Sequence, residues 1–138
     1  MKIALILSAQ SGTGKSTFAE SLEKLISDCV VCTADDYFLN DKGEYNFRMS
    51  ELSLAHKACQ KKFDEAVKIG VDLVICANTN TRAKDVAIYR KYAEREGYIV
   101  FHTVLLKTHE GADVHGVPSE VKDSQASAIV NMVTQSFK

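Results

Sequence analysis

The sequence predicts an α/β fold in which a four-stranded parallel sheet is flanked by helices, all within a single domain of residues 1–138. Apolar runs alternate with helical patterns along the chain, which is the alternation of β–α–β units. The run over residues 71–77 is apolar apart from Asp72, as in a strand buried on both faces. A glycine-containing turn joins the first apolar run to a helical pattern, the order that makes a phosphate-binding loop.

The first half of the chain contains two predicted strands and two predicted helices. In order they are a strand over residues 2–8, a helix over 15–27, a strand over 29–33 and a helix over 51–69. Ser50 is expected to be the N-cap of the long helix, and Gly70 is expected to end it. A polar, aromatic loop from Tyr37 to Arg48 precedes this helix, with a turn signal at residues 40–43.

The second half of the chain repeats the alternation. Its predicted elements are a strand over 71–77, a helix over 82–96, a strand over 98–106, a loop over 107–117 and a last helix introduced by Pro118 and Ser119. Crossovers between parallel strands are right-handed, so the loops after the first three strands open on the same edge of the sheet. Ligands of open α/β sheets bind at that edge.

The stretch from Ser8 to Thr17 carries the most informative motif of the chain. It follows the pattern G-x-x-x-x-G-K-S/T, with Ala9 in place of the first glycine. Backbone N–H groups of the turn and of the first helical turn converge on one anion, so we expect a nucleoside triphosphate to bind here. Lys15 is expected to reach its β- and γ-phosphates, and the hydroxyl of Ser16 or Thr17 is expected to lie beside Mg²⁺. The predicted nucleotide-binding residues are Gly12, Thr13, Gly14, Lys15, Ser16 and Thr17.

Two further polar stretches follow strands at the same predicted edge. Asp35 is the predicted catalytic residue beside Lys15, because a carboxylate at a strand end can accept the proton of an acceptor hydroxyl during phosphoryl transfer. Either Asp35 or Asp36 can instead hold Mg²⁺ through water, and Asp36 is equally open to interpretation as a turn cap. Asn78 and Asn80 are expected to hydrogen-bond a phosphate, a water or a neighbouring loop.

Composition narrows the possible partners and the cellular compartment. The formal net charge is −1, so no overall positive field exists to hold long nucleic acid nonspecifically. The four cysteines are expected to be buried free thiols of a cytoplasmic protein. No apolar run is long enough to predict a membrane span, so we expect no membrane association.

Five stretches together resemble the polynucleotide 5′-hydroxyl kinase family of P-loop phosphotransferases, which includes the phage end-healing kinases and related ATP-binding domains. The matching stretches are Gly12-Thr13-Gly14-Lys15-Ser16-Thr17, Asp35-Asp36-Tyr37-Phe38, Ala55-His56, Asn78-Thr79-Asn80-Thr81 and His115-Gly116-Val117-Pro118. The resemblance implies a P-loop NTPase three-layer sandwich, with ATP and Mg²⁺ as cosubstrates and transfer of the γ-phosphate to a 5′-hydroxyl. It also implies that Lys15 and Ser16 handle ATP and Mg²⁺, and that Asp35 is the general base.

The chain departs from that family at positions that bear on the acceptor. Phe38 stands where the phage kinases carry an arginine, and Ala77 stands where the third strand usually ends in an acid. The segment over 107–118, where the family's lid usually brings an arginine over the phosphates, contains none; Arg48 or Arg82 is a candidate substitute. The residues predicted to bind the acceptor are Asp36, Phe38, Asn78, Asn80 and Arg82.

Three functions follow from these observations. The leading hypothesis is an ATP-dependent phosphotransferase that acts on a 5′-hydroxyl end of DNA or RNA. A kinase for nucleosides, nucleotides or other small acceptors is the second, favoured by the near-neutral charge and by Phe38. A nucleotide-binding interaction module with weakened catalysis is the third, motivated by Ala77 and the arginine-poor lid.

Overall fold

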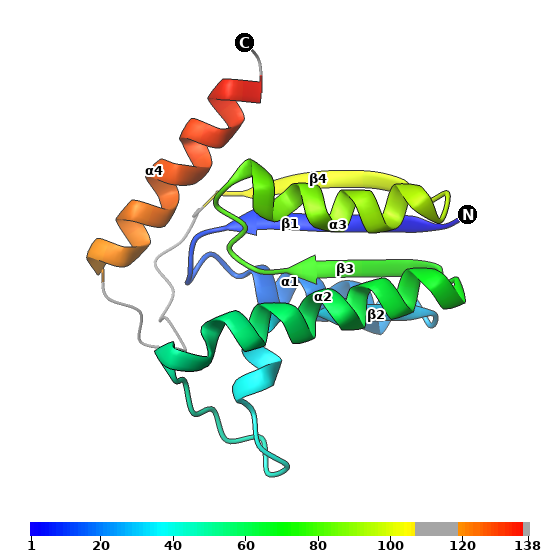
Figure 1. The fold of residues 1–138 in the computed structure, drawn as a ribbon, viewed down its shortest axis with the longest axis horizontal. Helices are drawn as coiled ribbons and strands as arrows, with labels where there is room; N and C mark the ends of the chain where they lie inside the picture. Colours follow the sequence, from blue (N-terminus) through cyan, green and yellow to red (C-terminus); the bar gives the residue numbers. More distant parts are fainter. Residues whose placement is uncertain (107–118, 137–138) are drawn as a thin grey trace.

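The computed structural model describes residues 1–106 and 119–136. Its strands are all parallel and form one sheet in the order β2-β3-β1-β4 (Figure 1). They are β1 (Ile3–Ala9), β2 (Cys29–Cys32), β3 (Leu73–Ala77) and β4 (Ile99–Leu105). The predicted four-stranded parallel sheet is therefore confirmed.

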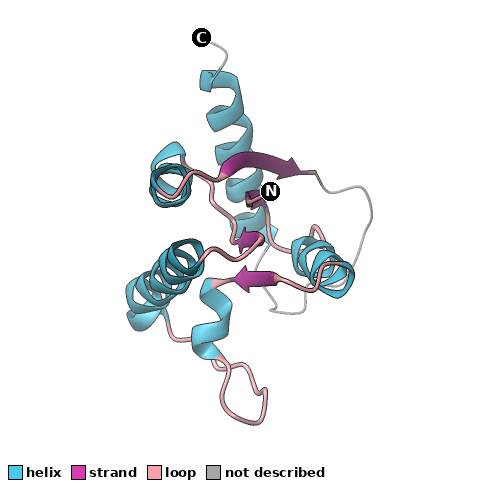
Figure 2. Ribbon diagram, turned by 90° about the vertical axis from the view of Figure 1, so that its right-hand side faces the viewer, coloured by secondary structure: helices cyan, strands magenta, loops and turns pink. Residues whose placement is uncertain are grey.

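Helices lie on both sides of the sheet, which gives the predicted three layers (Figure 2). They are α1 (Lys15–Leu25), α2 (Leu52–Ile69), α3 (Ala83–Arg95) and α4 (Ser119–Ser136), with two 3-10 helices, η1 (Ala34–Phe38) and η2 (Met49–Glu51). The helix α1 packs on one face of the sheet, whereas α2 and α3 pack on the other. The last helix, α4, crosses beyond the C-terminal ends of the strands (Figure 1).

The core is built on both faces of β3, whose five residues are all buried. Val74 faces the α2 and α3 side, where the rings of Phe63 and Tyr89 meet edge to face with centroids 5.0 Å apart. Ile75 faces the other side and packs with Ala19 of α1. The continuous apolar run in the sequence therefore corresponds to a strand covered by helices on both faces, as predicted.

The two ends of α2 differ in how well the sequence predicted them. Gly70 ends the helix in the left-handed conformation (φ 85°), and its N–H bonds back to the last turn, as predicted. The prediction that Ser50 is the N-cap was wrong, because Ser50 lies inside η2 and the cap residue is Glu51. Glu51 Oε1 accepts a hydrogen bond from the Tyr37 hydroxyl at 2.8 Å. This contact ties the start of α2 to η1.

Strand register brings the predicted polar stretches together at one edge. Leu7 of β1 pairs with Ala77 of β3, and Cys32 of β2 pairs with Cys76 of β3. These strands therefore end nearly level, and the phosphate loop, η1 and the 78–81 stretch all follow at the same edge. The convergence predicted from the handedness of the crossovers is confirmed.

The cysteines are free thiols, and Cys29 is the one that is partly exposed. Burial raises the pKa of Cys32 to about 12 and that of Cys76 well above its ordinary value, so both remain protonated at neutral pH. Within residues 1–106 and 119–136, no three His, Cys, Asp or Glu side chains gather as they would around a metal ion. None of the helices in that part of the chain has the length and apolar character needed to cross a membrane.

Candidate active site

The predicted phosphate loop lies between the end of β1 and the start of α1. Gly12 (φ 82°) and Gly14 (φ 90°) have left-handed backbone conformations that strain any residue with a Cβ. The helix begins at Lys15 without an acidic residue in its first turn, so its positive end is not neutralised locally. Ala9 is buried within β1, and its N–H donates to the carbonyl of Thr79 at 3.1 Å. The backbone fits a phosphate group, and the strand accommodates alanine at the first glycine position.

Lys15 and Asp35 line one cavity of about 500 Å³. Lys15 comes from the start of α1 and is 9% exposed, whereas Asp35 comes from η1, directly after β2. The same cavity is bordered by Ser11 of the phosphate loop, His56 of α2 and Gln125 of α4. The structure therefore brings the two residues predicted to be catalytic to one cavity.

Ser16, the predicted Mg²⁺ ligand, lies on a neighbouring cavity of about 380 Å³. Asp35 and Asp36 line this cavity too, so Asp35 borders both. Ala77 lines it at the end of β3 and contributes no charge. A hydroxyl and a carboxylate that line one cavity are compatible with Mg²⁺, which prefers oxygen ligands and is usually held by few carboxylates and several waters.

Hydrogen bonds from three segments fix the position of Asp35. The Thr33 hydroxyl caps η1 by accepting the Asp35 N–H at 3.2 Å. The neighbouring Ala34 N–H donates to Asn78 Oδ1 at 2.8 Å. The Tyr45 hydroxyl donates to Asp35 Oδ1 at 3.2 Å. The backbone at Ala34 and Asp35 is thereby attached to the ends of β2 and β3, and the Asp35 carboxylate is attached to the loop that follows η1.

Asp36 points toward α2. Its Oδ2 lies 3.8 Å from Lys62 Nζ, which also donates to the Val31 carbonyl at 2.8 Å. Partial burial raises the pKa of the Asp36 carboxyl, and the Lys62 charge opposes that rise. The side chain thus has a contact with the helix, and its role in acceptor binding stays a prediction.

Both predicted asparagines are 5% exposed and bond within the protein. Asn78 accepts the Ala34 N–H, and its amide nitrogen lies 3.5 Å from the Tyr89 hydroxyl. Asn80 donates to the Leu7 carbonyl at 2.7 Å and has a left-handed backbone (φ 45°). These contacts correspond to the interpretation in which asparagines join neighbouring loops, although Asn78 also lines the cavity of Lys15 and Asp35.

The remaining predicted acceptor residues do not line that cavity. Phe38 is 3% exposed and packs edge to face on Phe47, with centroids 5.1 Å apart. Arg82 forms a two-pronged contact with Asp85 at the start of α3, with distances of 3.2 and 3.1 Å. The segment over 107–118, which holds the predicted lid and the His-Gly-Val-Pro stretch, lies outside the described residues.

The structure adds residues that sequence reasoning did not assign to the site. Tyr45, Phe47 and His56 line the cavity. Gln125 Oε1 accepts a hydrogen bond from the Ser11 N–H at 2.9 Å, so α4 contacts the phosphate loop directly. A signal for Gln125 was present, because it falls among the apolar positions of its helix, where a polar side chain needs a partner.

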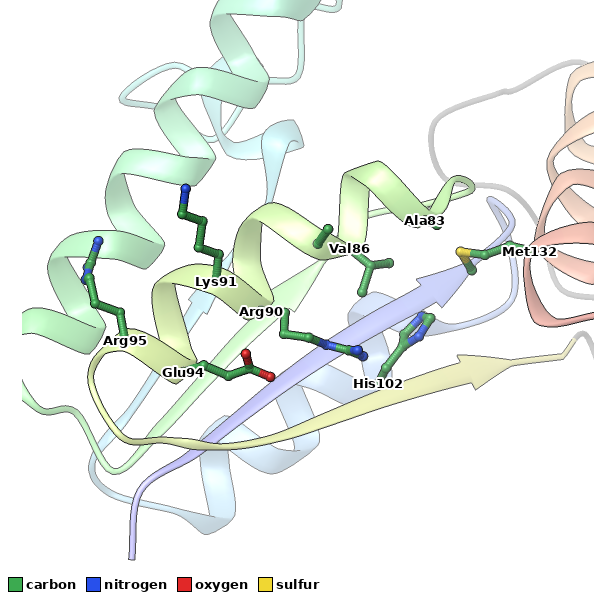
Figure 3. A pocket seen from close by; sticks show the side chains of 9 residues that line it. Ala83, Val86, Arg90, Lys91, Glu94, Arg95, His102 and Met132 are labelled. Atoms are coloured by element: carbon green, nitrogen blue, oxygen red, sulfur yellow. The ribbon is translucent and has the colours of Figure 1, made fainter. Parts of the chain in front are cut away.

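A third cavity, of about 650 Å³, lies between α3, β4 and α4 (Figure 3). Arg90 and His102 point into it, and Met132 borders it from α4 (Figure 3). His102 Nε2 lies 2.8 Å from Ser8 Oγ, and burial together with the Arg90 charge lowers the pKa of this histidine. No predicted nucleotide-binding residue lines this cavity, so the candidate active site is the cavity of Lys15 and Asp35.

The sequence is similar to part of one much longer protein. No model of a known protein family matches it. NEDD4-binding protein 2 of Homo sapiens is 30% identical over 98 residues, which cover 71% of this chain and 6% of that protein. The chain therefore spans only a small part of this relative's length.

Solved structures of other proteins share the fold of this chain. A chain in the Pnkp1/Rnl/Hen1 RNA repair complex is 17% identical with a TM-score of 0.74, over 97% of this chain and 46% of that one. The APS kinase CysC of Mycobacterium tuberculosis is 18% identical with a TM-score of 0.55, over 96% of this chain and 97% of that one. At these identities the likeness shows the fold, and the predicted P-loop α/β sandwich is confirmed.

Proposed function

We propose that this protein is an ATP-dependent phosphotransferase of the P-loop kinase type. The observation that carries the proposal is that Lys15 and Asp35 line the same cavity. Phosphoryl transfer needs neutralisation of phosphate charge and an oriented acceptor oxygen, and these two side chains meet those needs. The fold shared with an APS kinase supports the same class of reaction.

The predicted nucleotide-binding and catalytic residues each have a role in the proposed reaction. Backbone N–H groups from Gly12 to Thr17 bind the phosphates, and Lys15 offsets their charge. Ser16 would hold Mg²⁺, which when bound would supply positive charge to the phosphates. The acceptor oxygen bonds to the γ-phosphorus while its proton passes to Asp35, and the bond from the γ-phosphorus to the β–γ bridging oxygen breaks to release ADP.

We propose a 5′-hydroxyl end of DNA or RNA as the acceptor. The resemblance of five stretches to polynucleotide kinases supports this choice, as does the fold shared with a chain of an RNA repair complex. A kinase for a small acceptor is the second candidate, because the APS kinase matches over nearly the whole of both chains. The cavity of about 500 Å³ also falls within the size range of small-molecule sites.

The test is transfer of label from γ-labelled ATP to a 5′-hydroxyl oligonucleotide, with mononucleosides and adenosine phosphosulfate assayed in parallel. We expect labelled oligonucleotide from the wild-type protein. Asp35→Asn should lower kcat by about 10²- to 10⁴-fold while ATP still binds, because it removes a general base. Lys15→Ala should instead weaken ATP binding itself, since it removes the cation at the phosphates.

Asp41→Asn is the matched control for Asp35→Asn. Asp41 lies in the loop that follows η1, is exposed and lines neither cavity of the site, so its replacement should leave transfer unchanged. Label on mononucleosides or adenosine phosphosulfate alone would select the small-acceptor kinase. An absence of transfer to every acceptor, with a control kinase active in the same tube, would refute the phosphotransferase proposal.

A further inference from the structure

Apolar side chains line the cavity beside a charged group. Phe47 is 44% exposed and Met49 is 71% exposed, and both border the cavity of Asp35. Tyr45 and Leu52 line the same cavity, and Val121 borders it from α4. We call Tyr45, Phe47 and Met49 the apolar wall. Side chains of this kind are normally buried, so their exposure in a cavity favours a ligand with an apolar surface.

The apolar wall is held in place by the segment that carries it. The Asn46 N–H donates to the Phe38 carbonyl at 2.9 Å, and Leu39 pairs with Tyr45 in an antiparallel bridge. The buried Phe38 ring contacts Phe47 edge to face with centroids 5.1 Å apart. The loop therefore folds back on η1, and Phe47 keeps a defined position relative to the carboxylate of η1.

The apolar wall lies on the side of the site where the acceptor would bind. Tyr45, a wall residue, donates its hydroxyl hydrogen bond to Asp35, the group that is proposed to take the acceptor's proton. The donor's phosphates belong at Lys15, which lies on the phosphate loop and not in the segment of the wall. An acceptor whose hydroxyl reaches Asp35 would therefore place its adjoining atoms beside Phe47 and Met49.

We infer that the apolar wall is the binding surface for the nucleobase of the acceptor's terminal nucleoside, with Phe47 as its principal residue. This inference rests on the proposed phosphotransferase function and adds a base-recognition subsite to it. A nucleobase has a flat apolar face, and stacking on aromatic side chains tolerates every base. Among the described lining residues, Lys15 and Asp35 carry the formal charges, so the wall offers no ion pair to a charged acceptor such as a phosphorylated sugar.

The test compares two oligonucleotides that differ only at the 5′-terminal residue. One carries a normal nucleoside, and the other carries a tetrahydrofuran abasic residue with the same 5′-hydroxyl. We expect the wild-type protein to prefer the normal end by about 5- to 150-fold in kcat/KM, the range of one base–aromatic stack. In Phe47→Ala this ratio should fall toward one, whereas Phe47→Trp should retain it.

The ratio is internally controlled, because both acceptors are assayed with the same enzyme and any loss of folded protein cancels. Phe101→Ala is the matched variant, since Phe101 is 51% exposed on β4 and lines none of the site cavities. It should keep the wild-type ratio. Equal rates on both ends in the wild type, or an unchanged ratio in Phe47→Ala, would overturn the inference. A rise in the KM for ATP with no change in the ratio would assign the wall to the donor base instead.

Binding separates failure of this inference from failure of the proposed function. Fluorescence anisotropy measures the Kd of both oligonucleotides for the protein loaded with a non-hydrolysable ATP analogue. Weaker binding of the abasic end without any transfer would refute the kinase reaction and leave the base-binding wall in place. Equal binding of both ends would refute the wall, whatever the transfer assay shows.

Discussion

Asn78 offers the sharpest test of how the site is held together. Its Oδ1 accepts the Ala34 N–H at 2.8 Å, directly before Asp35 in η1. Its amide nitrogen lies 3.5 Å from the Tyr89 hydroxyl and 3.4 Å from Cys59 Sγ. Asn78→Ala removes all of these contacts at once. We therefore expect it to lower both the stability of the protein and the rate of transfer, without loss of ATP binding.

The size of the stability loss in Asn78→Ala follows from the burial of the groups that Asn78 contacts. Ala34 is 7% exposed, so its N–H would lose its acceptor in a place that water reaches poorly. An unsatisfied buried donor costs about 1–3 kcal/mol, and the space left by the side chain adds about 1 kcal/mol. The free energy of unfolding should fall by about 2–4 kcal/mol, a large part of the roughly 5–15 kcal/mol of an ordinary domain. Transfer should slow because η1 is no longer tied to β3.

Urea unfolding and the transfer assay measure these two effects. Asn40→Ala is the matched control, because Asn40 Oδ1 also accepts two backbone N–H groups, those of Lys42 and Glu44, each at 2.9 Å. Asn40 is exposed, so water can replace it, and its loss should cost less than about 1 kcal/mol. An Asn78→Ala variant no less stable than Asn40→Ala would refute the reasoning.

Three further predictions concern stability. Phe63→Ala should lower the free energy of unfolding by about 3–5 kcal/mol, because the ring is fully buried. Phe101→Ala, at an exposed site, should lower it by less than about 1 kcal/mol. Equal losses of stability in urea unfolding would contradict this prediction. The hydrogen bond with Arg95 lowers the pKa of the Asp64 carboxyl in the folded protein. This contact therefore stabilises the fold at neutral pH, and the stabilisation is lost as the pH falls below the ordinary carboxyl pKa of about 3.9. The difference in the free energy of unfolding between wild type and Asp64→Asn should therefore narrow from pH 7 to pH 3. A constant difference would contradict this prediction. Burial lowers the pKa of His102, so the wild type should lose stability as the pH falls below about 6.5, and His102→Gln should lose less over the same range in thermal melts.

Local patterns were enough to predict the elements and the edge where they converge. The apolar run over 71–77 predicts a strand buried on both faces, and the glycines of the phosphate loop predict a left-handed backbone. Both predictions need only the residue types of the segment itself. Right-handed crossovers then place three loops at one edge without knowledge of any contact. The N-cap at Ser50 was mispredicted because the cap depends on a 3-10 turn and on the contact of Glu51 with Tyr37, which no local pattern shows.

The sequence by itself determined the parallel sheet, the phosphate loop and the approach of Lys15 to Asp35. Only the tertiary structure decided how the surrounding side chains divide between core and cavity. Phe38, at the end of η1, is buried, while Phe47, nine residues later, is partly exposed in the site. Gln125 reaches the phosphate loop from the last helix. The physical reason is that these assignments depend on contacts between segments far apart in the chain, whereas the apolar pattern of a strand and the glycines of a turn are set by near neighbours.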